Sequence, residues 1–219
     1  MANTAALQPS HKSRLRFAKR AICCAAMKFL AFPAVALALS TFATPAAARV
    51  DASSDAGFAV VHEVDIAATP TQLWLVLTRP SSWWSKGHTW SGDAANLWMV
   101  PRQGGCFCET LPLPEKRNGR RHPDSWPTGF VQHASVIYAR PDQLLRLSGV
   151  LGPLQSEGLT GTLSFAIAPV ANGTSKLKLD YVVGGYSRIP LKSVAPAVDA
   201  VLAEQVARLK AASEQAAKR

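Results

Sequence analysis

The sequence has few cysteines and lacks the short motifs of many metal- and nucleotide-dependent enzymes. Only four of the 219 residues are cysteine, and two of these, Cys23 and Cys24, precede residue 49. Apart from the closely spaced Cys106 and Cys108, no pair of cysteines or histidines has the spacing of metal ligands. The sequence also contains no nucleophile elbow and no glycine-rich loop of the kind that binds phosphate. We therefore predict that the protein uses no metal and no cofactor.

Acidic residues are absent from the first 48 residues, which also contain the long apolar run of the chain. The apolar run, Phe29 to Ala43, follows a basic stretch and precedes the small residues Ala46–Ala48. This three-part order is typical of a secretory signal peptide. The run is about 15 residues long, shorter than the roughly 20 that a membrane-spanning helix needs. The basic stretch consists of Lys12, Arg14, Arg16, Lys19 and Arg20.

We accordingly predict that residues 1–48 are a signal peptide cleaved near Ala48. The protein would be secreted or periplasmic and would contact a membrane only during export; an uncleaved anchor is the alternative. Met27-Lys28 followed by Phe29-Leu30 would form a compact signal peptide alone, so translation is expected to start at Met27.

Removing the leader also changes what the charge implies. The whole chain carries a formal net charge of +10, but six of its 24 basic residues and none of its 14 acidic ones precede residue 49. The remaining 18 basic and 14 acidic residues give a net charge of only +4. This mild excess gives nucleic-acid binding little support, so we predict no nucleic-acid partner.

Cys106 and Cys108 are the cysteines that remain after the leader. An even number of cysteines in an exported protein permits a disulfide. Their Cys-Phe-Cys spacing places both side chains on one face of a strand, near the outer limit of bridging geometry. Two interpretations stay open, a strained bridge or two free, partly buried thiols.

About 170 residues suit a single domain. Residues 49–57 are small and polar and are expected to be a flexible lead-in. The domain itself is expected to span residues 58–213, with a tail at 214–219. Its first strand alternates from Phe58 to Ile66, and Thr69-Pro70 with Gln72 forms a capping box for a helix to about Arg79. One more helical turn is expected over residues 81–86.

Strands and turns dominate the next hundred residues. The clearest hairpin joins residues 159–167 and 177–183 through Asn172-Gly173. A final helix, entered between Pro190 and Pro196, is expected to run to about Ser213. A strand pair or one irregular strand is expected at 90–100, and further strands are expected at 106–111, 129–139 and 144–151. Residues 112–128, which contain four prolines together with Lys116, Arg117, Arg120 and Arg121, are predicted to be a basic loop.

The order of these elements resembles the SRPBCC (START-like, helix-grip) superfamily, and most closely its heat-shock-ATPase-activator-like and polyketide-cyclase-like branch. The resemblance covers roughly residues 58–213. It depends on Ala68-Thr69-Pro70 with Leu73-Trp74, Thr78-Arg79-Pro80 with Trp83-Trp84, Gly104 to Glu109, the Gly129 strand ending in Ala139-Arg140-Pro141, and Val206 to Lys210.

The resemblance implies an α+β helix-grip fold. In this fold a curved antiparallel sheet of about seven strands wraps around a long C-terminal helix, with two short helices after the first strand and a cavity inside. Members of the superfamily bind hydrophobic or amphipathic molecules, shuttle lipids, cyclise polyketides or regulate a partner ATPase, and they share no catalytic residues. The leader, the two thiols and the basic loop depart from the near relatives and argue against a cytosolic chaperone-activator role.

The expected function is therefore non-catalytic binding of a hydrophobic small molecule or lipid in an internal cavity. Trp83 and Trp84 would serve as a core plug or as a ligand wall. The residues expected to line or gate the pocket are Trp83, Trp84, Trp98, Phe107, Phe130 and Tyr138.

Two alternatives remain. One is a cyclase/aromatase-like enzyme in which His133, paired with Glu109 or Glu157, shifts protons on a substrate, with Asp93 beside His88 as a further candidate. The other is a protein-interaction module that uses the basic loop at 112–128. His62, on the apolar face of the first strand, is interpreted as a satisfied core histidine.

Overall fold

The computed structural model describes residues 49–114, 116–117, 119–121 and 127–219. The predicted signal peptide and the expected start at Met27 lie outside these residues. Eight antiparallel strands form one sheet in the order β1-β2-β10-β9-β8-β7-β4-β3. The bounds of these strands are β1 Arg49–Ser54, β2 Gly57–Ile66, β3 Leu97–Met99, β4 Cys106–Leu111, β7 Gly129–Arg140, β8 Leu144–Ser148, β9 Gly158–Pro169 and β10 Ser175–Tyr186.

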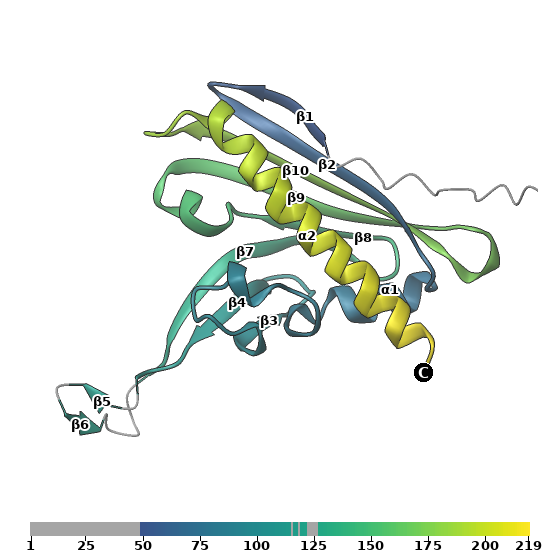
Figure 1. The fold of residues 1–219 in the computed structure, drawn as a ribbon, viewed down its shortest axis with the longest axis horizontal. Helices are drawn as coiled ribbons and strands as arrows, with labels where there is room; N and C mark the ends of the chain where they lie inside the picture. The colour runs from purple at the N-terminus through teal and green to yellow at the C-terminus, as the bar shows by residue number, and fades with distance from the viewer. Residues whose placement is uncertain (1–48, 115, 118, 122–126) are drawn as a thin grey trace, which may run out of the picture. The chain divides into compact units, whose positions relative to one another are not determined.

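A single long helix, α2 (Leu191–Ala217), lies across one face of this sheet (Figure 1). It contacts β1, β2 and the short helix α1 (Pro70–Leu77). A curved antiparallel sheet with one long C-terminal helix is the helix-grip architecture. The predicted fold class is therefore confirmed, with eight strands in place of about seven.

Helix α1 begins where the sequence indicates. Thr69 is extended (φ −66°, ψ 158°) and its Oγ1 accepts a hydrogen bond from the Gln72 N–H at 3.3 Å. The Gln72 Oε1 in return accepts the Thr69 N–H at 2.9 Å, and Pro70 occupies the first helical turn. This reciprocal pair satisfies two backbone donors that the first turn cannot satisfy itself. The helix ends at Leu77, two residues earlier than expected, and a 3₁₀ turn at Pro80–Ser82 replaces the second helix.

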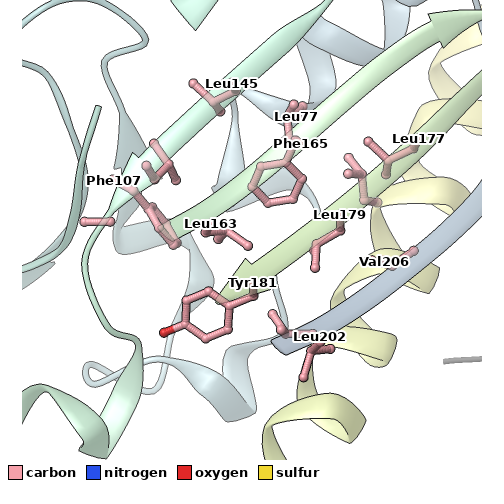
Figure 2. Close-up of a cluster of buried hydrophobic side chains, with 14 of the residues drawn as sticks. Leu77, Phe107, Leu145, Leu163, Phe165, Leu177, Leu179, Tyr181, Leu202 and Val206 are labelled. Carbon is pink, nitrogen blue, oxygen red and sulfur yellow. The ribbon is translucent and has the colours of Figure 1, made fainter. Parts of the chain in front are cut away.

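The core lies between the sheet and the two helices. Strands β9 and β10 pair so that Leu163 lies opposite Tyr181 and Phe165 opposite Leu179, and all four side chains are buried. The predicted alternation is thus confirmed on both strands. Figure 2 shows this cluster, with Leu202 and Val206 of α2 among its members. Each such side chain contributes roughly 1.5–3 kcal/mol relative to an exposed one.

Several segments differ from the expectation. The expected lead-in contains β1, which pairs with β2 from Arg49 opposite Val61 to Ser54 opposite Gly57. Backbone pairing to an open strand edge explains why small, polar residues are ordered there. The expected tail also differs, because α2 continues to Ala217. Its Glu214 accepts the Ala67 N–H at 3.1 Å, which ties this last stretch to the end of β2.

The regions around residues 90–100 and 112–128 also differ in detail. The first contains a 3₁₀ turn, Ala94–Asn96, and only the three-residue strand β3. The second contains two very short paired strands, β5 (Lys116–Arg117) and β6 (Arg120–Arg121), within what was expected to be a loop.

Candidate functional site

A histidine and a glutamate from adjacent strands meet in the interior. The Nε2 of His133 in β7 lies 3.0 Å from the Oε2 of Glu109 in β4. Glu109 is fully buried and His133 is 5% exposed. The two residues proposed from sequence as a proton-shifting pair therefore do lie in contact, whereas Glu157, the alternative partner, instead pairs with Arg188 at 2.7 Å.

A β-bulge directs His133 inward. Phe107 lies opposite Ala134 and Cys108 lies opposite Gln132, so His133 is the extra residue of β7. An extra residue breaks the strict alternation of a strand and redirects a side chain. His133 and its neighbour Ala134 are consequently both buried.

The carboxylate of Glu109 has a full set of donors. Its Oε2 accepts the Trp90 N–H at 3.0 Å, and its Oε1 accepts the Ser91 N–H at 2.5 Å. Burial disfavours the charge, but the hydrogen bonds from Ser91, Trp90 and His133 outweigh it, so the pKa of Glu109 is lowered. Glu109 is therefore ionised at neutral pH.

The ionised carboxylate determines the state of the histidine. Burial lowers the pKa of His133, and the hydrogen bond and charge of Glu109 offset only part of that effect. His133 is thus neutral at pH 7, and because a carboxylate only accepts, its Nε2 carries the proton. The lone pair is then on Nδ1, which has no hydrogen-bond partner among the residues that the structure describes.

Aromatic side chains connect this pair to the segment that follows α1. The ring centroids of His133 and Phe107 are 4.8 Å apart, those of Phe107 and Trp84 are 5.1 Å apart, and those of Trp84 and Trp83 are 5.3 Å apart. The two pairs that include Trp84 adopt the edge-on arrangement that aromatic quadrupoles favour. Trp83, Trp84 and Phe107 are all buried, so they form one continuous aromatic column.

Polar side chains of α2 hold the segment Trp83–His88. The Oε1 of the buried Gln205 accepts the Ser85 N–H at 2.8 Å, and Arg208 donates its Nε–H to the Trp83 carbonyl at 2.8 Å. The indole N–H of Trp84 is donated within the segment, to the His88 carbonyl at 2.9 Å. His88 in turn lies 3.0 Å from Glu204 of α2.

A hollow of about 790 Å³ opens beside this segment. We call it the Trp84 hollow. Its lining combines one indole, small side chains, three serines, two cations and one carboxylate, namely Ser81, Ser82, Trp84, Ser85, Lys86, Gly87, Gly92, Asp93, Ala94, Ala95 and Arg208. It lies open at the surface and is not an enclosed cavity. Buried side chains of the core cluster come from both the sheet and α2. A second hollow, of about 430 Å³, lies between α1 and the end of α2.

The six aromatic residues expected at the pocket divide into two groups. Trp83, Trp84 and Phe107 form the buried column, and Trp84 also lines the hollow. Trp98, Phe130 and Tyr138 are 42%, 70% and 43% exposed, so they do not face the interior as expected. Trp98 lies opposite Cys108 and Phe130 opposite Thr110, which by alternation is the other face of β4 from buried Phe107 and Glu109.

Asp93 caps a turn, while His88 pairs with Glu204 of α2. The Oδ1 of Asp93 accepts the Ala95 N–H at 2.9 Å and so caps the Ala94–Asn96 turn. His62, interpreted as a satisfied core histidine, lies beside the carboxylate of Asp199, but the two groups lack hydrogen-bond geometry. Its Nε2 lies 3.0 Å from the Oδ1 of Asp199 in α2. Burial lowers the pKa of His62 by more than Asp199 raises it.

The two cysteines of β4 are joined. Cys106 and Cys108 form a disulfide with their Cα atoms 5.6 Å apart. Of the two open interpretations, the structure shows the bridge. Within the described ranges no group of three or more His, Cys, Asp or Glu is placed to hold a metal ion, and no helix is long and apolar enough to span a membrane.

No protein-family model matches the chain, and no curated protein matches its sequence. Solved structures do match. A Staphylococcus aureus protein of unknown function is 13% identical (TM-score 0.49, covering 74% of this chain and 98% of that chain). Norcoclaurine synthase from Thalictrum flavum is 14% identical (TM-score 0.45, 74% and 96%). The di-domain ARO/CYC StfQ of the steffimycin biosynthetic pathway is 14% identical (TM-score 0.48, 75% and 53%). The helix-grip fold of this chain is established by the strand order of the sheet and by the long C-terminal helix α2.

Proposed function

We propose that this SRPBCC-type protein is exported and binds a hydrophobic or amphipathic small molecule in the Trp84 hollow. The observation that carries the proposal is the position of the buried aromatic column, whose middle member Trp84 lines a hollow of about 790 Å³. This volume falls within the range of roughly 300–1,000 Å³ typical of small-molecule sites.

The lining favours an amphipathic molecule with an acidic group. Trp84, Ala94 and Ala95 offer apolar surface, while Lys86 and Arg208 contribute two positive charges. The single carboxylate of the lining, that of Asp93, already accepts the Ala95 N–H. An apolar body would lie against the indole, and an anionic end would face the two cations.

Export is supported by two independent features. The leader has the order of a secretory signal, and the Cys106–Cys108 disulfide is a bond that persists in oxidising compartments. Mass analysis of the mature N-terminus tests this part. A chain that begins near residue 49 supports export, and one that retains the leader contradicts it.

Binding is tested with 1-anilinonaphthalene-8-sulfonate, an apolar aromatic anion, added to the purified mature protein. We expect saturable fluorescence enhancement together with quenching of tryptophan emission. Reversing the charge in Lys86→Glu should weaken binding by roughly three- to tenfold, because the site then repels the sulfonate.

Lys192→Glu is the matched control, since Lys192 is an exposed lysine in the first turn of α2 that does not line the hollow. It should bind as the wild type does. An unchanged near-ultraviolet circular dichroism spectrum excludes binding to a loosened state. Absence of saturable binding, or an equal effect of both substitutions, would contradict the proposal.

A further inference from the structure

The second hollow adjoins the Trp84 hollow. It has a volume of about 430 Å³ and lies between α1 and the C-terminal part of α2, which contact each other (Figure 1). We call it the α1–α2 groove. Ser82, in the turn that follows α1, lines both the groove and the Trp84 hollow. The two hollows therefore meet at this residue.

One face of α2 also runs along both hollows. Arg208 lines the Trp84 hollow, and Ala212, Ala216 and Arg219 line the α1–α2 groove. These four residues are four, four and three positions apart, so they lie on one side of the helix. At a rise of about 1.5 Å per residue, the stripe from Arg208 to Arg219 is roughly 16 Å long. The two hollows thus form one elongated furrow along α2.

The groove combines apolar surface with positive charge. Leu75 of α1 is 49% exposed, and it lines the groove together with the two alanines of α2. Arg79 and Arg219 contribute two guanidinium groups, and no acidic side chain is among the described residues that line the groove. The guanidinium of Arg79 is exposed and makes no hydrogen bond or ion pair with any residue that the structure describes. A carboxylate matches such a guanidinium, because it can accept two parallel hydrogen bonds from it.

We propose that the ligand is an elongated molecule with an acidic group at each end and an apolar chain between them, lying along this furrow. The inference rests on the proposed function, because one acidic end occupies the Trp84 hollow beside Lys86 and Arg208. The apolar chain passes Ser82 and lies against Leu75, and the second acidic group binds Arg79. A molecule with a single acidic group would leave the guanidinium groups of the groove against an apolar chain.

Tetradecanedioate and tetradecanoate are the probes, at concentrations at which neither aggregates. Their chains are equally long, and only the first carries a second carboxylate. In isothermal titration calorimetry with the purified protein, the dicarboxylate should bind roughly three- to tenfold more tightly than the monocarboxylate, a modest factor because water and salt screen an exposed ion pair. Equal affinity for the two probes would overturn the inference.

Arg79→Glu isolates the groove, since Arg79 lines the groove and not the Trp84 hollow. The variant should lose the preference for tetradecanedioate and should bind 1-anilinonaphthalene-8-sulfonate as the wild type does. Arg102→Glu is the matched control, because Arg102 is an exposed arginine that lines neither hollow. It should keep the preference. The same loss in both variants would reflect the net charge of the protein and would overturn the role of the groove.

Filling the groove tests the path of the apolar chain. Ala216→Trp places an indole in the groove and should weaken tetradecanedioate binding by roughly tenfold, because methylene groups of the chain lose their apolar contact. Ala211→Trp is the matched control, since Ala211 is exposed on the same helix and lines neither hollow. Wild-type affinity in Ala216→Trp would overturn the path through the groove.

Failure of this inference is distinguishable from failure of the proposed function. Saturable binding of 1-anilinonaphthalene-8-sulfonate, together with equal affinity for the two acids, would overturn the elongated ligand and leave the Trp84 hollow as the site of a compact molecule. If neither the sulfonate nor the dicarboxylate binds, both proposals are overturned.

Discussion

Gln205, buried on α2, accepts the backbone N–H of Ser85 at 2.8 Å, across 120 positions of sequence. The contact attaches the segment that carries Trp83 and Trp84 to the helix that closes the fold. The amide of Gln205 is also donated to the Val201 carbonyl at 3.3 Å, so it is held on both sides. The Trp84 hollow thus depends on a side chain that lies outside its lining.

Gln205→Leu should therefore lower the free energy of unfolding by about 1–3 kcal/mol, because it leaves the Ser85 N–H buried and unpaired. Hydrogen exchange at the Ser85 amide should be faster in the variant. Gln215→Leu is the matched control, since Gln215 is exposed on the same helix. Equal stability and unchanged exchange in the two variants would refute the role of Gln205.

Tyr181 makes a single hydrogen bond that can be removed without creating a large cavity. Its hydroxyl accepts the Leu151 N–H at 2.9 Å, and burial raises the pKa of Tyr181 to about 12. Tyr181→Phe should cost about 1–3 kcal/mol in unfolding free energy, measured in urea. Tyr138→Phe, at a tyrosine that is 43% exposed, should change stability by less than about 0.5 kcal/mol. An equal loss of unfolding free energy in the two variants would contradict the role of the Tyr181 hydrogen bond.

Stability should fall with acidification below about pH 6.5. The pKa values of His62 and His133 are lowered by burial, whereas the unfolded chain binds protons with a pKa near 6.5. The unfolded state thus takes up protons first, and stability present above pH 6.5 is lost as the pH falls toward the folded pKa values. Glu109 contributes only at lower pH, because its pKa is lowered as well.

Urea unfolding at pH 7.5, 6.5 and 5.5 measures this dependence. The double variant His62→Gln/His133→Gln should show a smaller loss over the same interval than the wild type. A wild-type stability that is flat or rises on acidification would contradict the burial of both imidazoles in the neutral form.

The disulfide gives a mass prediction. Alkylation of the protein without reduction should modify neither Cys106 nor Cys108, and alkylation after reduction and unfolding should modify both. Cys106→Ser should expose the remaining thiol of Cys108 to the reagent once the chain is unfolded. Two alkylated cysteines in the unreduced, unfolded protein would show that the thiols are free.

Local patterns in the sequence were enough to predict α1 and the central hairpin. The capping box of Thr69 and Gln72 and the alternation of β9 and β10 are local signals, and each matches its element. The site is different, because the burial of His133 depends on a bulge of one residue in β7. A bulge is a property of the pairing of two strands, and the sequence of one strand does not reveal it.

The contacts that polar side chains of α2 make with other elements could not be predicted from the sequence either. No contact of Asp199, Gln205 or Arg208 was predicted from the sequence. Their contacts with His62, Ser85 and Trp83 depend on how the helix lies against β2 and the segment after α1. The exposure of Trp98 and Phe130 has the same kind of cause, since the register of β3 and β7 on β4 decides which face they occupy.

The central claim is that a small molecule binds at Trp84, and the indole N–H signals of the protein test it most directly. The indole N–H of Trp84 is donated to the His88 carbonyl, and that of Trp83 to the Leu77 carbonyl at 3.2 Å, so both signals are ordered reporters. In a nitrogen-15 NMR titration with 1-anilinonaphthalene-8-sulfonate, the account predicts a saturable shift of the Trp84 indole signal while that of Trp74 in α1 stays in place. A titration in which the Trp84 signal does not move, or in which only exposed Trp98 responds, would contradict it.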